Sequence, residues 1–146
     1  HTSYTLGRRI VIICLTPRHR DWYGESAEAP GLRDRSVNLR VLPVAVRNIS
    51  TVVEDLADPL CEECKQAVEE DRAEVVILGG GPTAGLTRRI SDQVPVPLLD
   101  DVSCTVQMAE SLARLPIEPP RRGGFSRPDP KPTKGLSPAL ATYFEG

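Results

Sequence analysis

Four apolar segments along the chain predict the strands of an open parallel sheet: Arg9–Thr16, Val37–Val44, Glu74–Leu78 and Val96–Leu99. The first is continuously apolar from Ile10 to Leu15, which is typical of a strand buried on both faces at the centre of a parallel sheet. The second alternates apolar and polar residues at its start and so fits an outer position. We therefore expect the first strand to lie between the second and the third.

A long amphipathic helix is predicted between the second and third strands. Thr51 and Glu54 form a capping box at its start. Apolar residues then recur close to helical spacing, at Val52, Val53, Leu56, Leu60, Cys64, Ala67 and Val68. Pro59 leaves two alternatives open. Either it kinks a single helix, or Asp58 caps a second helix that has Pro59 in its first turn.

Two further helices complete the predicted body. A short or broken helix fits residues 17–35, where Gly24, Pro30 and Gly31 interrupt the pattern. After the fourth strand, Asp101 or Ser103 caps a helix whose apolar residues are expected to face inward: Val102, Val106, Ala109, Leu112 and Ala113. Right-handed crossovers place such helices on both faces of a parallel sheet. The pattern therefore predicts an α/β fold with a flavodoxin-like open parallel sheet of four strands.

The end of the chain, from Pro116 onward, is rich in proline, glycine, arginine and lysine. This composition favours an extended arm that lacks regular structure over most of its length. The sequence thus predicts two parts, an α/β domain at residues 1–115 and a tail at residues 116–146.

The glycine triplet after the third strand is the candidate site. Gly79, Gly80 and Gly81 directly follow the strand and precede Thr83. Backbone N–H groups of such a loop can approach an anion closely, at the strand ends where parallel sheets bind ligands. We expect these amides to bind a small anion, with the Thr16 and Thr83 hydroxyls as helpers. A tight turn without a ligand, with Thr16 as a helix cap, is the alternative. The spacing matches neither a P-loop nor the usual dinucleotide fingerprint.

Composition and charge narrow the choice of partners. The 146 residues are 40% hydrophobic and 26% charged, as in an ordinary globular domain. A net charge of −2 argues against a nucleic-acid surface, and no apolar run has the length of a membrane-spanning helix. We expect neither a nucleic-acid nor a membrane partner. The chain begins with His1 instead of methionine, which fits a processed product or a piece of a longer protein.

The four cysteines, Cys14, Cys61, Cys64 and Cys104, lie in predicted strands and helices, as expected of a reduced, cytoplasmic chain. Cys61 and Cys64 form a C-x-x-C without the second pair that a zinc site needs, so no metal is predicted. If Asp58 caps a helix, Cys61 lies near an N-terminus that stabilises a thiolate, and redox chemistry is then possible. Packing of Cys64 against the sheet is the alternative.

Two longer stretches carry a resemblance to a known family. The runs AVEEDRAEVVILGGGPTAGLTRRI and VPVPLLDDVSCTVQMAESLARL occur in the order and spacing of the C-terminal half of the Asp/Glu/hydantoin racemase superfamily. The likeness is greatest to the hydantoin racemase branch and extends from about Arg9 to Lys134. The resemblance implies an isomerase that works without metal or cofactor. Its two catalytic cysteines would lie on opposite sides of the substrate carbon, one from each half of the protein.

This chain departs from the family at one important position. The family's second cysteine belongs to a word like V-L-G-C-A, whereas this chain reads Leu78-Gly79-Gly80, so that Gly80 stands where the thiol is expected. The half that carries the other cysteine is not in this chain. Cys104 lies within a predicted helix where the family usually has a small residue, and we interpret it as filler.

The resemblance therefore implies a cofactor-independent, racemase-like protein that transfers a proton at a carbon next to a carboxylate or imide carbonyl. We expect it to act on a small carboxylate or hydantoin-like ligand as part of a longer protein, and to be inactive as this chain alone. Its partner would be the missing N-terminal half or a second copy of the chain. The alternative is a non-catalytic binding or assembly domain that retains the fold and a small-anion site. A flavodoxin-like nucleotide-binding domain is a third possibility.

Overall fold

The computed structural model describes residues 2–28, 36–44, 52–118, 120–126 and 129–145. The chain forms two compact units, His1–Glu110 and Ser111–Gly146. The predicted capping residue Thr51 and the predicted helix breakers Pro30 and Gly31 lie outside the described residues. The predicted division at residue 115 stays a prediction.

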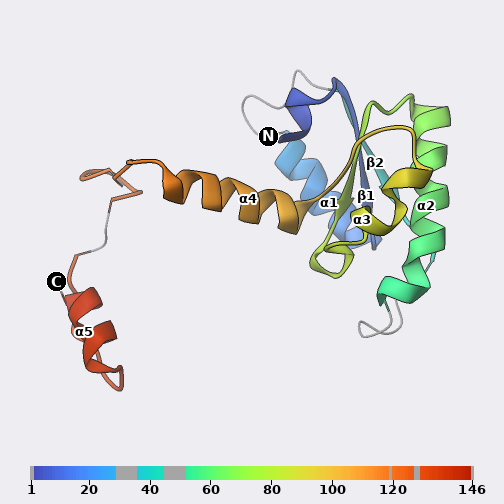
Figure 1. Cartoon of the computed structure of the whole chain (residues 1–146). Coiled ribbons are helices and arrows are strands. Elements are labelled where there is room, and N and C mark those ends of the chain that lie inside the picture. Colours follow the sequence, from blue (N-terminus) through green and yellow to red (C-terminus); the bar gives the residue numbers. More distant parts are fainter. Residues whose placement is uncertain (1, 29–35, 45–51, 119, 127–128, 146) are drawn as a thin grey trace. The chain divides into compact units, whose positions relative to one another are not determined.

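Four parallel strands form a single sheet in the first unit (Figure 1). They are β1 (Arg9–Cys14), β2 (Ser36–Val41), β3 (Val75–Gly79) and β4 (Leu98–Asp100), in the order β2-β1-β3-β4. The predicted flavodoxin-like sheet and the central place of the first strand are confirmed. β1 ends before the predicted boundary at Thr16, because Thr16 caps the helix that follows.

Helices cover both faces of the sheet, as predicted. α1 (Pro17–Ala27) lies on one side, against β1 and β2, and α2 (Val52–Asp71) lies on the other (Figure 1). The short helix α3 (Thr87–Ile90) contributes Ile90 to the same core as α2, and its N-cap residue Leu86 belongs to that core as well. The connections also contain 3₁₀ turns, namely η1 (Thr2–Thr5), η3 (Gly81–Thr83) and η4 (Ser91–Gln93).

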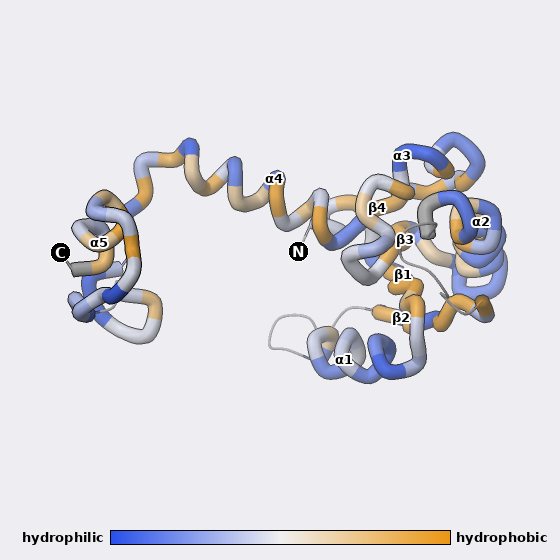
Figure 2. The backbone as a smooth tube through the Cα atoms, turned by 90° about the horizontal axis from the view of Figure 1, so that it is seen from below, coloured by the Kyte–Doolittle hydropathy of each residue, from blue (hydrophilic) through white to orange (hydrophobic). Residues whose placement is uncertain are grey.

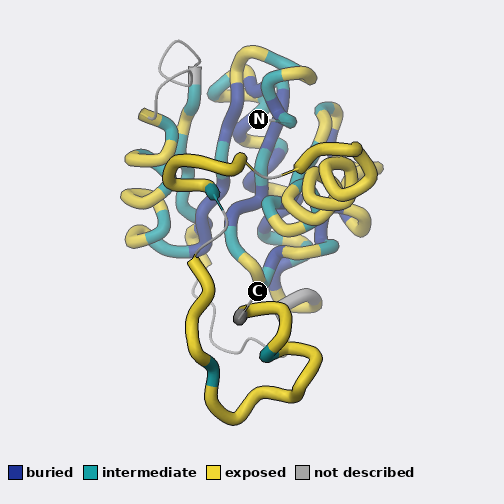
Figure 3. The backbone as a smooth tube through the Cα atoms, turned by 90° about the vertical axis from the view of Figure 1, so that its left-hand side faces the viewer, coloured by how far each residue is buried: buried dark blue, intermediate teal, exposed yellow. Residues whose placement is uncertain are grey.

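The core explains why the first strand is apolar without interruption. Val11 and Ile13 of β1 belong to the cluster beneath α2, and Ile10 and Cys14 point to the opposite face; all of them are buried. Figure 2 shows these apolar strands at the centre of the unit, and Figure 3 shows that the buried backbone is concentrated there. A strand with both faces covered needs apolar residues at every position.

Helix α1 is the short helix predicted after the first strand, and Gly24 does not interrupt it. A Cβ atom at Gly24 would lie 3.4 Å from the Cδ1 atom of Leu39 on β2, an ordinary van der Waals contact, so this side of α1 packs against β2. The helix begins where sequence chemistry indicates, with Thr16 as N-cap and Pro17 in the first turn.

Helix α2 is continuous through Pro59. The alternative in which Asp58 caps a second helix is therefore wrong. Proline removes one backbone hydrogen bond from the helix. Burial of Leu56, Leu60 and Cys64 on one face of α2 offsets this loss, because the same packing surface continues on both sides of the proline.

Helix α4 (Asp101–Arg114) differs from its prediction in two ways. Its N-cap is Asp100, whose Oδ1 accepts a hydrogen bond of 2.6 Å from the Ser103 N–H, so the predicted caps Asp101 and Ser103 are wrong. The predicted inward-facing residues are also wrong, since Val102, Val106, Ala109, Leu112 and Ala113 are all exposed. Helical spacing identifies an apolar face but not a partner that covers it.

The second unit contains a helix, α5 (Pro138–Glu145), that we did not predict. A local signal for it exists, because Ser137 precedes Pro138 and its hydroxyl accepts a hydrogen bond from the Leu140 N–H. Residues 116–118, 120–126 and 129–137 form neither helix nor strand. The extended tail at residues 116–146 stays a prediction.

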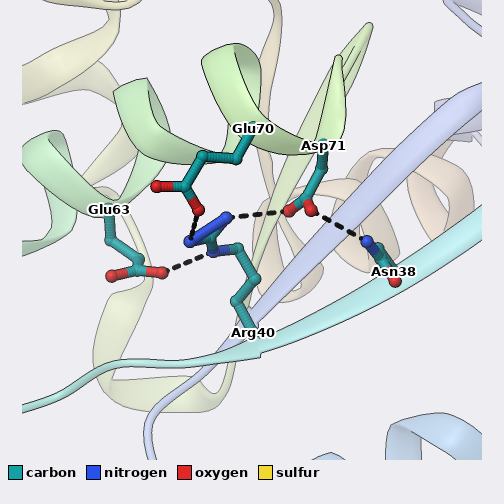
Figure 4. A network of polar contacts seen from close by, with 5 residues as sticks. All are labelled: Asn38, Arg40, Glu63, Glu70 and Asp71. Carbon is teal, nitrogen blue, oxygen red and sulfur yellow. Dashed lines mark hydrogen bonds and ion pairs between the residues drawn. The ribbon is translucent and has the colours of Figure 1, made fainter.

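Arg40 on the edge strand β2 lies at the centre of a charged network with α2 (Figure 4). Its guanidinium bonds to Glu63 at 2.6 Å, to Glu70 at 2.7 Å and to Asp71 at 2.9 Å. Asn38 donates a further hydrogen bond of 3.0 Å to Asp71. Glu63 is only 7% exposed, so its charge depends on Arg40 for compensation. The network fixes α2 on the edge of the sheet.

Replacing Arg40 by methionine should lower the free energy of unfolding by about 2 kcal/mol, because Glu63 would remain buried without its cationic partner. Urea denaturation of the purified chain measures this effect. The matched control is Lys65→Met, which removes an exposed cation that is paired with Glu62, and we expect no measurable loss. Equal stability of the two variants would contradict a stabilising role of the network.

Limited proteolysis should cleave within residues 116–137 before it cuts the first unit. The described residues of this segment are almost all exposed and lack strands that would protect their backbone. Mass spectrometry of the early fragments identifies the cut sites. Early cleavage inside β1 or β3 would contradict this order.

Candidate functional site

The candidate site lies at the carboxyl edge of the sheet, where three chain segments meet. Parallel pairing places Cys14 at the end of β1 opposite Gly79 at the end of β3, and Leu78 opposite Asp100 at the end of β4. The segments that follow these strands are the start of α1, the glycine loop and the start of α4. This is the edge at which open parallel sheets bind ligands.

The glycine loop is a tight turn that contains a single 3₁₀ turn. Gly80 has φ +117° and ψ 138°, a conformation that residues with a Cβ atom rarely adopt. Gly79 is buried, and a Cβ atom there would lie 2.7 Å from the Tyr23 ring. Gly81 is exposed and has open space around it. Gly79 is thus in close contact with α1, Gly80 has a backbone conformation that favours glycine, and Gly81 is open to solvent.

The two threonines that we predicted as helpers bond to the chain itself. The Thr83 hydroxyl is fully buried and donates to the Gly80 carbonyl at 2.7 Å. The Thr16 hydroxyl accepts the His19 N–H at 3.3 Å as the cap of α1. The alternative interpretation of Thr16 as a helix cap is therefore realised. Thr83 stabilises the turn from inside.

Two adjacent carboxylates at the start of α4 have different surroundings. Asp100 is 2% exposed, and both of its oxygens have partners, the Ser103 N–H at 2.6 Å and the Thr87 hydroxyl at 3.1 Å. Burial by itself would raise the pKa of Asp100, but the hydrogen bonds from Ser103 and Thr87 hold it below its ordinary value. Asp100 is thus a structural anion that joins α4 to α3.

Asp101 turns toward the glycine loop instead. Its Oδ2 accepts the Gly80 N–H at 3.0 Å and the Tyr23 hydroxyl at 2.9 Å. Its Oδ1 is buried and has no hydrogen-bond partner among the described residues. Burial, together with the hydrogen bond to Asp101 and the charge of that residue, raises the pKa of Tyr23. The Tyr23 hydroxyl therefore stays protonated and acts as a donor at neutral pH.

The sequence contained no clear signal for Tyr23. It lies in α1, in the least periodic part of the body, and only tertiary packing brings it against Gly79 and Asp101. Asp101 itself was visible in the sequence, but as a candidate helix cap. Its contact with Gly80 depends on the register of β3 and β4.

The thiols of Cys14, Cys64 and Cys104 are not activated. Burial raises the pKa of Cys14 to about 11 and that of Cys64 to about 12. Burial also raises the pKa of Cys104. Cys61 and Cys64 lie in the interior of α2 and not at a helix start, which contradicts the basis of the redox interpretation. Both belong to the core cluster, so packing is their role in this fold. Within the described residues, no cluster of cysteine, histidine and acidic side chains fits a metal ion.

Comparison with known proteins decides the family. The model of the Asp/Glu/Hydantoin racemase family matches residues 1–109, which is most of the chain. The chain belongs to the Asp/Glu/hydantoin racemase family. It is 27% identical over 131 residues to a hydantoin racemase of Paenarthrobacter aurescens, and 27% identical over 126 residues to one of Pseudomonas sp. strain NS671. These alignments cover 90% and 86% of this chain.

Solved structures of two allantoin racemases agree with the fold. The chain is similar to an allantoin racemase from Pseudomonas fluorescens, with a TM-score of 0.73, 28% identity and 92% of this chain covered. It is also similar to an allantoin racemase from Klebsiella pneumoniae, with a TM-score of 0.76, 25% identity and 96% coverage. The chain spans only 57% of either structure, and 56% and 51% of the two hydantoin racemases.

The glycine loop and the start of α4 both lie within residues 1–109, the part of the chain that the family model matches. None of the helices in the described part of the chain has the length and apolar composition that crossing a membrane requires.

The conformation of Gly80 yields a prediction for the loop. Gly80→Ala should lower the free energy of unfolding by roughly 2 kcal/mol, because φ +117° is strained for any residue with a Cβ atom. Gly81→Ala is the matched control, since a Cβ atom there meets nothing within 4 Å. Urea denaturation of both variants measures the difference. Equal stabilities would mean that the loop relaxes without cost.

Proposed function

We propose that this chain is the C-terminal half of a cofactor-independent, racemase-like isomerase. Its reaction is proton transfer at a carbon next to a carboxylate or imide carbonyl, and its ligand is a small carboxylate or a hydantoin-like ring. The observation that carries the proposal is the family match over residues 1–109 together with 57% coverage of two allantoin racemase structures. The proposal includes a reducing, cytoplasmic setting, because Cys14, Cys61, Cys64 and Cys104 are all free.

The proposed chemistry needs a group that stabilises negative charge on oxygen. Removing a proton next to a carbonyl builds an enolate, and fixed backbone N–H groups lower its energy; losing one such donor costs roughly two to three orders of magnitude in rate. The glycine loop supplies N–H groups at the carboxyl edge of the sheet. We assign this role to the amides of Gly79, Gly80 and Gly81, next to Thr16 and Thr83.

The same proposal leaves one face of the substrate carbon, the one next to the glycine loop, without a group that carries the proton. The resemblance aligns Gly80 with the second catalytic cysteine of the family, and a racemase needs an acid or base on each face of the carbon. The thiols of Cys14, Cys64 and Cys104 do not replace it, because burial raises their pKa values above the ordinary value. We therefore expect this chain alone to be inactive as a racemase.

Two observations support a partner: the greater length of the relatives and the exposed apolar residues of α4. The relatives are almost twice as long as the part that this chain matches. Val102 and Val106, which lie one turn apart on the same face of α4, are 39% and 47% exposed. A second structural half would cover such an apolar face and contribute the other proton carrier. We propose that this half, or a second copy of the chain, is the partner.

A second candidate function is a non-catalytic binding or assembly domain. Two observations favour this candidate. The Gly80 N–H of the glycine loop already donates to Asp101. In addition, burial raises the pKa values of the Cys14, Cys64 and Cys104 thiols, so none of the three is activated. In that case the chain retains the fold and the anion site but transfers no proton. The two candidates differ in whether a partner half with a cysteine restores exchange at the substrate carbon.

Two measurements on the same ligands test the main proposal. Succinate and 5-methylhydantoin are titrated into the labelled chain, and the amide signals of Gly79–Thr83 are followed by NMR. We expect shifts in the loop with at least one of the two ligands, and no loss of optical rotation from a single enantiomer of 5-methylhydantoin.

Shifts confined to other regions would contradict the site. Racemisation by the chain alone would contradict the missing proton carrier. If Cys14→Ser or Cys104→Ser abolished that activity, the thiol would have been assigned to the wrong position. Deuterium uptake at the ring carbon with retained configuration would instead show proton transfer on one face.

A further inference from the structure

The contact between Asp101 and the glycine loop resembles a bound carboxylate. One oxygen, Oδ2, receives two donors from different elements, the Gly80 N–H of the loop at 3.0 Å and the Tyr23 hydroxyl of α1 at 2.9 Å. Two converging donors are a common way to bind one carboxylate oxygen. The acceptor here belongs to the chain itself.

We propose that Tyr23 and Gly80 form a two-donor site for carboxylate ligands, and that Asp101 fills this site from within the chain. A small carboxylate then binds only by displacing the Asp101 side chain. The inference rests on the proposed anion-binding role of the loop. It adds Tyr23 as a binding residue and Asp101 as an internal competitor.

The donors are held in place independently of Asp101. The Tyr23 ring lies against Gly79, where a Cβ atom would come within 2.7 Å of it, so this ring position requires glycine. Gly80 keeps its orientation through the turn, since the Thr83 N–H and the Thr83 hydroxyl both donate to its carbonyl, at 2.9 Å and 2.7 Å. Removing the Asp101 carboxylate should therefore leave the two donors aimed at the same point.

The internal carboxylate is only half satisfied. Oδ1 of Asp101 is buried and has no partner among the described residues, whereas both oxygens of the neighbouring Asp100 have one. A buried acceptor without a hydrogen bond weakens the contact that holds it. Asp100 is thus fixed by its surroundings, and Asp101 is the carboxylate that can leave. A ligand whose second oxygen reaches water or a further donor competes with it effectively.

The test compares Asp101→Ala with Asp92→Ala, which removes the same charge from an exposed position on η4. Succinate is titrated into the wild-type chain and both variants, and the dissociation constant is taken from the Gly80 amide shift. We expect Asp101→Ala to bind succinate roughly tenfold more tightly than the wild type. The variant no longer occupies the two donors with its own carboxylate, so succinate gains their charge-assisted hydrogen bonds without displacing a side chain. We expect Asp92→Ala to change the affinity by less than about twofold, because exposed charges act weakly over a distance.

Adding Tyr23→Phe to Asp101→Ala should remove most of the gain, because one of the two donors is then lost. Asp101→Asn provides a second variant in case the alanine variant does not fold. It keeps the shape of the side chain but holds the Gly80 N–H with a neutral acceptor, and an intermediate gain is expected. Hydrogen exchange at the Gly80 amide should also be faster in both Asp101 variants.

The outcomes separate this inference from the proposed function. Suppose that succinate shifts the loop amides of the wild type, but Asp101→Ala binds succinate no more tightly. Then Asp101 does not compete with the ligand, while the glycine loop still binds anions. If only 5-methylhydantoin binds at the loop, Tyr23 and Gly80 do not form a carboxylate site, and the proposed function stands. If neither the wild type nor any variant shows loop shifts with either ligand, both proposals fail.

Discussion

The register of three parallel strands is the constraint on which the candidate site depends. Cys14 pairs with Gly79 across β1 and β3, and Leu78 pairs with Asp100 across β3 and β4. The chain therefore leaves the sheet at the same edge three times, into α1, the glycine loop and α4. A shift by one residue in β4 would reverse the faces of its side chains and separate Asp101 from Gly80. The apolar core beneath α2 maintains this register, because Val76 and Leu78 are fully buried in it.

Two neighbouring aspartates illustrate how position in the fold decides chemistry. Asp100 ends β4 and points into the first unit, where a helix N–H and a threonine hydroxyl satisfy it. Asp101 begins α4 and reaches the loop on the other side, and one of its oxygens has no hydrogen-bond partner in the part of the chain that the structure describes. The same side chain thus serves as a permanent cap in one position and as a displaceable anion in the next. Both carboxylates lie at the carboxyl edge of the sheet, where open parallel sheets bind ligands.

The first unit is well packed on one face of the sheet and less covered elsewhere. α2 and α3 bury the cluster around Val76 and Leu78, and a charged network around Arg40 anchors the outer strand. By contrast, α1 buries none of its own residues, and the apolar residues of α4 remain exposed. The racemases that match the chain extend well beyond it, and we propose that a partner half covers these surfaces.

The sequence alone determined the sheet and its strand order, because continuous apolar runs and right-handed crossovers leave few alternatives. The family was indicated by the resemblance of two long stretches to its members. The sequence also placed the glycine loop at the correct edge. It did not determine whether Pro59 divides a helix, since the burial of Leu56 and Leu60 around the proline decides that. Nor did it reveal Tyr23 as a partner of Asp101, or the exposure of Val102 and Val106 on α4. These features depend on contacts between segments far apart in the chain, and local pattern carries no information about which partner, if any, a side chain meets.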